Sequence, residues 1–330
     1  MTSRYVLFRR LALAGVVLAF GVVVLGAYVR LNAAGLGCPD WPGCYGHLSV
    51  DDAARNVDAI NEAFPHRPFE YHKAIKEMVH RYFASSLGLL ILVLAGLAIA
   101  NRKDPQQPLM LPIVLVGLVI LQGLLGMWTV TLLLKPAIVA GHLLGGMATL
   151  SLLVWLFLAQ GAYAPAPEAR ALRIPALVAL VAVVMQIALG GWVSANYAAL
   201  ACPDLPLCQG AALPPMDFGH AFHMLRGLGE TSDGARLPDE ALTAIHWTHR
   251  VFALFVVAAA GWVSFRAFSI LKPLAIAVAL ALALQFLLGV ANVTLGLPLA
   301  LAAAHNAGAA LLLACLVVLN YFSFRDLRPS

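Results

Sequence analysis

Eight long apolar segments constrain this chain more than any other feature of its sequence. They lie at residues 11–29, 79–100, 109–130, 137–159, 174–195, 247–265, 273–293 and 299–321. Each approaches the roughly 20 residues that an α-helix needs to cross a hydrocarbon core about 30 Å thick. With 62% hydrophobic and 11% charged residues, the chain has more apolar surface than a soluble domain can bury. We predict an all-α, polytopic membrane protein of eight transmembrane helices.

Basic residues in the connections predict how these helices are oriented. Arg and Lys precede the first segment and follow the second, fourth, sixth and eighth, whereas the short loop after the third has only Lys135. The positive-inside rule therefore places both termini in the cytoplasm. The first segment is long for a signal peptide, and no Arg-rich transit peptide precedes it, which favours a retained helix in a bacterial inner membrane. The net charge of +5 belongs to these loops, so we expect a lipid bilayer and no nucleic acid as partner.

The sequence repeats after four segments. Matching residues are 163 or 164 positions apart: Gly26 and Gly190, Cys38 and Cys202, Gln122 and Gln285, Gly126 and Gly289, His142 and His305. Four segments followed by four more predict two parallel, pseudo-symmetric four-helix bundles. We place the first bundle in residues 1–165, with an outer loop at 31–76. The second occupies residues 166–330, with an outer loop at 196–245.

A histidine lies near the start of every even-numbered segment, at His80, His142, His249 and His305. A lone membrane histidine is most often a packing residue, but four at equivalent, shallow positions on the outer side suggest a shared role. Two imidazoles facing each other in a four-helix bundle are the ligands of a bis-histidine heme. His246, one helical turn before His249, is a competing ligand, although the repeat favours His249.

Charged residues accompany the first histidine of each half. Arg81 and Arg250 directly follow their histidines and are candidates for binding heme propionates, a role compatible with snorkelling to the interface. Glu77 precedes His80 by one helical turn, and its counterpart in the second half is His246. This carboxylate either handles protons during chemistry at a heme or lies in headgroup water, paired with a basic neighbour. Both interpretations remain open.

Four of the five cysteines form two Cys-x5-Cys pairs in the outer loops. We predict the disulfides Cys38–Cys44 and Cys202–Cys208, because the compartment outside a bacterial inner membrane is oxidising. Each would stabilise the fold by roughly 2 kcal/mol. The spacing is not a zinc pattern, whereas a catalytic thiol role for the first pair stays open. We expect the outer-loop histidines to be solvated: His47, His66, His72, His220 and His223.

Taken together, these motifs resemble the heme A synthase family over essentially the whole chain. The resemblance is carried by Gly35-Leu-Gly-Cys-Pro-Asp-Trp-Pro-Gly-Cys44, Glu77-x-x-His80-Arg81, His142, His249-Arg250 and His305. It implies an eight-helix oxidoreductase that converts the C8 methyl group of heme O to the formyl group of heme A. The reaction would proceed by successive hydroxylations and loss of water from a geminal diol.

The resemblance also implies different roles for the two halves. The substrate heme would meet His80, His142 and Glu77, whereas His249 and His305 would hold a heme b that passes electrons. Implied partners are heme O synthase, cytochrome oxidase assembly factors and an electron-transfer partner of unknown identity. The electron donor or acceptor, the source of the formyl oxygen and the oligomeric state are not specified by the sequence.

Two other functions remain as alternatives. One is a membrane b-type cytochrome that exchanges electrons with a quinone, and the other is a heme transporter or chaperone. Cytochromes of the first kind usually stack hemes across the membrane, whereas the four histidines here predict two hemes at equal depth. That difference disfavours the cytochrome.

Overall fold

The computed structural model describes residues 3–104, 106–164 and 166–325, so the chain ends and residue 165 at the predicted bundle boundary lie outside the described residues. Within these ranges every regular element is helical, and eight helices are long and apolar enough to cross a membrane. They are α1 (Ser3–Leu31), α4 (Tyr71–Ala100), α5 (Met110–Thr131), α6 (Pro136–Ala159), α7 (Arg173–Ala195), α9 (Asp239–Ala267), α10 (Lys272–Thr294) and α11 (Leu299–Phe324). The predicted all-α membrane fold is confirmed.

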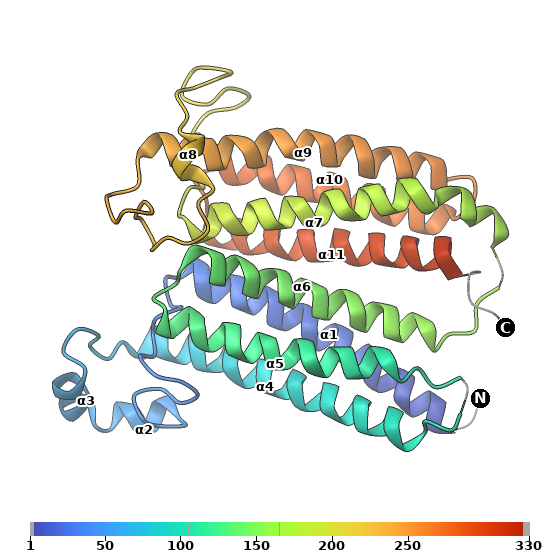
Figure 1. Ribbon diagram of the computed structural model, residues 1–330, viewed down its shortest axis with the longest axis horizontal. Helices are drawn as coiled ribbons and strands as arrows, with labels where there is room; N and C mark the ends of the chain where they lie inside the picture. The colour runs from blue at the N-terminus through green and yellow to red at the C-terminus, as the bar shows by residue number, and fades with distance from the viewer. Residues whose placement is uncertain (1–2, 105, 165, 326–330) are drawn as a thin grey trace.

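The eight helices pack as two rings of four (Figure 1). In the first ring α1 and α5 each contact both α4 and α6, and in the second α7 and α10 each contact both α9 and α11. The cyclic order of the helices is therefore the same in the two rings. The rings meet through contacts of α1 and α6 with α11, and of α6 with α7.

The backbone repeats at the same offsets as the sequence. Residues with positive φ recur in pairs 163 or 164 positions apart: Ala33 (51°) and Tyr197 (55°), Tyr45 (54°) and Gln209 (54°), Gly46 (78°) and Gly210 (76°), Leu134 (58°) and Leu297 (63°). Few L-residues adopt this conformation, so its recurrence is specific. The connections that follow matching helices therefore turn in the same way.

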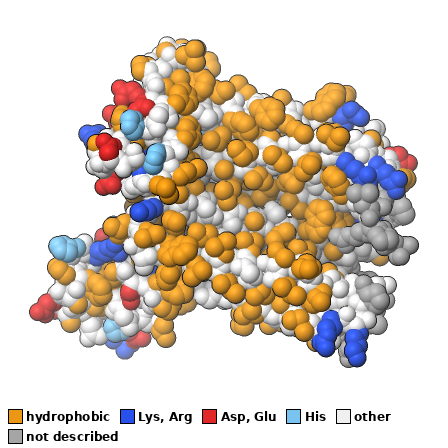
Figure 2. Space-filling view, viewed as in Figure 1, with side chains coloured by type: hydrophobic (Ala, Val, Ile, Leu, Met, Phe, Trp, Pro, Cys, Tyr) orange, Lys and Arg blue, Asp and Glu red, His pale blue; other side chains and the backbone are white. Residues whose placement is uncertain are grey.

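Hydrophobic side chains cover the middle of the molecule, whereas charged side chains gather at its two ends (Figure 2). Large apolar residues such as Leu89, Ile120, Leu254 and Leu280 are exposed on this middle zone. A bilayer can solvate such a surface and water cannot. Inside the rings, fully buried alanines such as Ala179 let neighbouring helices approach closely.

Three helices begin eight residues earlier than the apolar pattern predicts. The structure starts α1 at residue 3, α4 at residue 71 and α9 at residue 239, whereas the predicted starts are 11, 79 and 247. At 30 residues, α4 is about 45 Å long and exceeds a hydrocarbon core of about 30 Å. Its first turns therefore extend into the polar region, where helix formation needs no apolar sequence. Glu77 and His246 thus lie about two turns inside a helix, although the predicted segments begin only after them.

The outer loops share one end of the molecule, opposite the start of α1 and the end of α11 (Figure 1). The first contains α2 (Val50–Ala54) and α3 (Val57–Ala63), and the second contains α8 (Phe218–Ala221). At the other end, the 3-10 helix η1 (Pro167–Leu172) precedes α7. The loops therefore form a polar cap above the ends of the helices that carry the four histidines.

An arginine joins the two rings beneath this cap. Arg30, at the end of α1, donates hydrogen bonds to the Tyr197 hydroxyl (2.5 Å) and the Ser194 carbonyl (3.1 Å) at the end of α7. Its guanidinium also lies over the Tyr197 ring, 4.0 Å from the ring centre. A cation at the C-terminus of a helix satisfies carbonyls that have no partner within the helix. This contact fixes the two halves relative to each other on the loop side.

Candidate functional site

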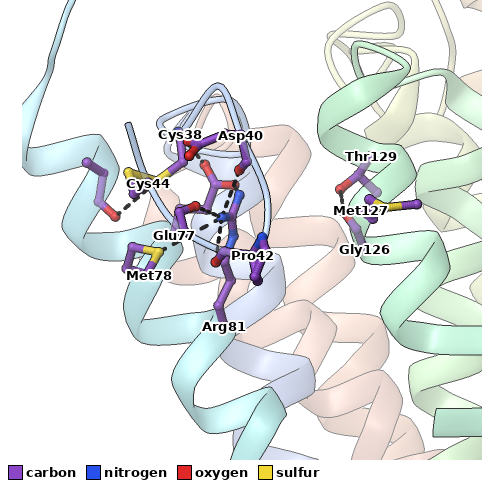
Figure 3. Close-up of polar contacts among 12 residues, drawn as sticks. Cys38, Asp40, Pro42, Cys44, Glu77, Met78, Arg81, Gly126, Met127 and Thr129 are labelled. Atoms are coloured by element: carbon purple, nitrogen blue, oxygen red, sulfur yellow. Dashed lines mark hydrogen bonds and ion pairs between the residues drawn. A yellow bond between two sulfur atoms is a disulfide. The ribbon is translucent and has the colours of Figure 1, made fainter. Parts of the chain in front are cut away.

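The first disulfide loop folds down onto the side of α4 (Figure 3). Both predicted disulfides, Cys38–Cys44 and Cys202–Cys208, are present. The Cys38 backbone N–H donates to Glu77 Oε2 at 2.9 Å, and Arg81 Nη2 lies 2.5 Å from Glu77 Oε1. Glu77 is only 5% exposed, so its charge depends on these two partners. The structure therefore shows Glu77 paired with Arg81, not immersed in solvent.

Arg81 connects this carboxylate to the loop. It donates to the backbone carbonyls of Asp40 (3.0 Å), Pro42 (3.3 Å) and Gly43 as well as to Glu77 (Figure 3). A guanidinium has five N–H donors and can serve several acceptors at once. The loop, Arg81 and Glu77 consequently form one hydrogen-bonded unit. The predicted contact of Arg81 with a heme propionate stays a prediction.

The second half builds its loop in the same way with one substitution. The Cys202 backbone N–H donates to His246 Nδ1 at 3.2 Å, as Cys38 does to Glu77. Arg250 donates to the carbonyls of Asp204 (2.8 Å) and Leu207 (3.1 Å), as Arg81 does in the first loop. His246 therefore takes the structural place of Glu77, with a neutral acceptor where the first half has a carboxylate.

An aspartate shapes the turn of each disulfide loop. Asp40 accepts hydrogen bonds from the backbone N–H groups of Tyr45 (2.6 Å) and Gly46 (2.7 Å). Asp204 accepts the equivalent bonds from Gln209 (2.6 Å) and Gly210, which lower its pKa. These turns are therefore structural, and what distinguishes the two loops is the residue beneath each of them, Glu77 or His246.

The four predicted ligand histidines lie in pairs, one pair in each ring. His80 on α4 and His142 on α6 are on helices that lie diagonally opposite, each packed between α1 and α5. His249 on α9 and His305 on α11 have the same relation to α7 and α10. Two imidazoles on diagonal helices are the arrangement that a bis-histidine heme requires.

The surroundings of these four imidazoles fit metal ligation. The Nδ1 atoms of His80, His142 and His305 are buried and have no hydrogen-bond partner. A buried polar atom without a partner is costly, so unpaired imidazoles inside a bundle point to a ligand. Among the described residues, no group of three or more His, Cys, Asp or Glu side chains could hold a metal ion. A heme iron needs only two axial protein ligands, and each ring of four helices offers two histidines.

Glutamines contact the histidines of the second ring. Gln186 Nε2 donates to the His249 carbonyl at 3.0 Å and lies 3.2 Å from His249 Nδ1. Gln285 Nε2 lies 3.3 Å from His305 Nε2. In the first ring, Gln122 is the sequence counterpart of Gln285, but its Nε2 is buried without a partner. The second pair of histidines is thus the more firmly held.

Other polar residues lie away from these pairs. In the second outer loop His220 Nδ1 contacts Asp217 Oδ2 at 2.6 Å, and Arg226 is buried against Asn196 Oδ1 at 2.5 Å. The buried contact of Arg226 was not predicted from the sequence. An apolar groove of about 580 Å³ runs beside Leu109 and Trp155, at the opposite end of α5 and α6 from His142. Neither region adds a residue to the histidine pairs.

The sequence is similar to known proteins over almost its whole length. Residues 9–317 match the model of a family described as cytochrome oxidase assembly protein (COX15-CtaA). A heme A synthase of Shewanella oneidensis is 42% identical over 306 residues, which cover 91% of this chain and 92% of that protein. A heme A synthase of Caulobacter sp. is 30% identical over 95% of this chain and 94% of its own length, and one of Caulobacter vibrioides is 30% identical over 94% of each. The matched region contains both disulfide loops, Glu77 and all four histidines.

Proposed function

This chain belongs to the COX15-CtaA family of cytochrome oxidase assembly proteins, and on that premise we propose that it acts as a heme A synthase. The reaction is an oxidation of the C8 methyl group of heme O to the formyl group of heme A. The observation that carries this conclusion is the 42% identity, over 91% of the chain, to a heme A synthase. The two pairs of diagonal histidines supply places for two hemes, one as substrate and one as cofactor.

The first ring, within residues 1–165, is the proposed substrate half. His80 and His142 would hold heme O through its iron, and Glu77 is one helical turn from His80 on the same side of α4. The carboxylate accepts hydrogen bonds from the Cys38 amide on Oε2 and from Arg81 on Oε1, and a carboxylate offers about four lone-pair positions in all. Glu77 is therefore held in place and can still accept a proton.

Glu77 would move protons at the oxidised carbon. After two hydroxylations the C8 carbon is a geminal diol, and its conversion to a formyl group releases one water. One hydroxyl must lose its proton while the other gains a proton and leaves. Glu77 can accept the first proton and return it to the leaving hydroxyl, so no net proton is consumed in this step. Arg81 keeps the carboxylate directed at one position throughout.

The second ring, within residues 166–330, is the proposed cofactor half. His249 and His305 would hold heme b, which supplies one-electron transfer when bound. Gln186 and Gln285 hold these two imidazoles, as expected for a group that remains bound. In the first ring the counterpart glutamine, Gln122, has an unpaired Nε2, as expected for a site that exchanges substrate for product, whereas an unpaired Nδ1 is common to His80, His142 and His305. This difference supports the assignment of the two halves.

The chain is a multi-pass membrane protein, and we place it in a bacterial inner membrane with both termini in the cytoplasm. The end of the molecule where α1 begins and α11 ends carries Arg9, Arg102, Arg173 and Lys272, in agreement with the positive-inside rule. The disulfide loops then face the oxidising compartment. Heme O synthase, oxidase assembly factors and an electron-transfer partner remain proposed partners.

Removing each disulfide separates its structural role from any role in catalysis. Replacing Cys202 and Cys208 with serine is expected to lower the free energy of unfolding by roughly 2 kcal/mol while heme A formation continues. The same change at Cys38 and Cys44 should cost similar stability and also reduce heme A formation, because the Cys38 amide holds Glu77. Thermal unfolding of the purified variants and extraction of their hemes measure both effects. Equal heme A output from the two variants would contradict a link between the first loop and the reaction.

The proposed activity is tested by expressing the chain in a bacterium that makes heme O but no heme A. Hemes extracted from the membranes are separated and identified by mass. Heme A, or heme O with a hydroxylated C8 methyl group, is the expected product, and it should be absent from the same host without the gene. Heme O recovered unchanged, together with bound heme b, would favour an electron-carrying cytochrome or a heme carrier instead.

A further inference from the structure

Each candidate ligand histidine packs against a glycine of a neighbouring helix. A β-carbon added to that glycine would meet Cε1 of the imidazole at a short distance. The four contacts are Gly26 with His80 (2.9 Å), Gly190 with His249 (3.0 Å), Gly289 with His305 (3.1 Å) and Gly126 with His142 (3.5 Å). The glycines come from α1, α7, α10 and α5, the helices on either side of the histidine helices.

These contacts are not a general property of glycines in these helices. Gly21 on α1, Gly123 on α5 and Gly261 on α9 have no other atom within 4 Å of an added β-carbon. The glycines that touch imidazoles also occur at repeat positions, with Gly26 and Gly190 164 residues apart and Gly126 and Gly289 163 apart. Close packing against an imidazole therefore accounts for glycine at positions 26, 190 and 289, while the contact at Gly126 is looser.

We propose that Gly26, Gly190 and Gly289 are positioning residues that set the ring orientation of three heme ligands, and that Gly126 does so more loosely for His142. The inference rests on the proposed function, because it takes the histidines to be heme ligands. The rings of His80 and His305 have unpaired Nδ1 atoms, so hydrogen bonds at those atoms do not fix them. Because the glycine has no side chain, the imidazole packs directly against the glycine's helix, and this contact limits rotation of the imidazole.

The distances predict which part of the structure yields when a methyl group is added. At 2.9 Å the carbon added at Gly26 overlaps the His80 imidazole, and at 3.0 and 3.1 Å the imidazoles of His249 and His305 must move by a few tenths of an ångström, whereas 3.5 Å is ordinary van der Waals contact. The atom nearest the added carbon is Cε1, at the far end of a histidine side chain with two rotatable bonds. The helix backbones, in contrast, are held by close packing against the neighbouring helices. The imidazole therefore turns and the helices stay packed. A heme ligand would lose its orientation in a protein that remains folded.

Single alanine substitutions test this in the full-length purified protein. Gly190→Ala and Gly289→Ala should lower the affinity for heme b by about tenfold to a hundredfold and shift the electron paramagnetic resonance signals of its low-spin ferric iron. Gly26→Ala should weaken heme O binding by a similar factor in titrations, and Gly126→Ala should have the smallest effect of the four. Gly21→Ala, Gly123→Ala and Gly261→Ala are the matched controls and should match the wild type.

Each outcome bears on the proposal. Wild-type heme affinity and spectra in both Gly190→Ala and Gly289→Ala would overturn it. A failure of these variants to fold as monodisperse protein would also overturn it, because the imidazole is expected to yield before the helix. If the wild-type protein itself binds no heme b and leaves heme O unchanged, the proposed function fails instead, independently of the glycines.

Discussion

Replacing Glu77 with glutamine is expected to lower heme A formation by about a hundredfold or more while both hemes remain bound, since general acid–base groups contribute about 10²–10⁴-fold. The glutamine has the same shape, and its carbonyl oxygen can still accept the hydrogen bond from Cys38. It cannot accept a proton, and it cannot form an ion pair with Arg81. Membranes containing the variant should accumulate heme O or a hydroxylated intermediate, measured by extraction and mass spectrometry.

The equivalent position in the second half provides the control. His246→Gln also keeps a neutral acceptor for a loop amide, in this case that of Cys202. If the chemistry is confined to the first ring, this variant should still form heme A. Normal heme A output from Glu77→Gln would remove Glu77 from the reaction. Loss of bound heme O from Glu77→Gln would mean that the carboxylate mainly anchors the loop over the substrate.

The second large effect concerns the division of labour between the two histidine pairs. Replacing His249 or His305 with alanine should remove heme b, because in either variant the heme iron would lose one of its two axial ligands. Replacing His80 or His142 should leave heme b bound and abolish heme A formation, because the substrate heme would be misplaced. Heme b per chain, measured on purified protein, and heme A in the membranes are the two readouts.

His246→Ala is the control for this series. In the wild type, His246 lies one turn from His249, but its Nδ1 accepts a hydrogen bond from the Cys202 amide and is therefore directed at the loop. The variant should therefore keep heme b. Loss of heme b from the His80 and His142 variants, with retention in the His249 and His305 variants, would reverse the assignment of the halves. Loss from His246→Ala alone would make His246 the ligand in place of His249.

The membrane fold could be predicted from the sequence because burial in lipid imposes a long apolar run on each helix. The same argument fails at the starts of α1, α4 and α9, each of which lies eight residues before the predicted start. Polar residues can form a helix outside the hydrocarbon, and nothing in an apolar pattern marks where that helix begins. The two disulfides could also be predicted, since two close cysteines in an oxidising compartment pair readily.

The contacts that define the site could not be predicted in the same way. The sequence made His246 the counterpart of Glu77, but Glu77 is 39 residues from Cys38 and His246 is 44 residues from Cys202, so their shared contact with a cysteine amide depends on how each loop folds back. Arg81 and Arg250 follow the histidines in the sequence, but their bonds to loop carbonyls depend on how each loop folds back. The glycines were recognisable as repeat positions, and only the packing of the helices shows that they touch the imidazoles.

Whether the methyl group is oxidised beside Glu77 is tested most directly by a structure of the purified protein with heme O bound. We expect the iron of heme O between His80 and His142, with the ring edge that carries the C8 methyl group directed at the Glu77 carboxylate. Heme b should lie between His249 and His305 in the same molecule. Heme O found between His249 and His305, or bound in the first ring with its C8 methyl group directed away from Glu77, would contradict the assignment.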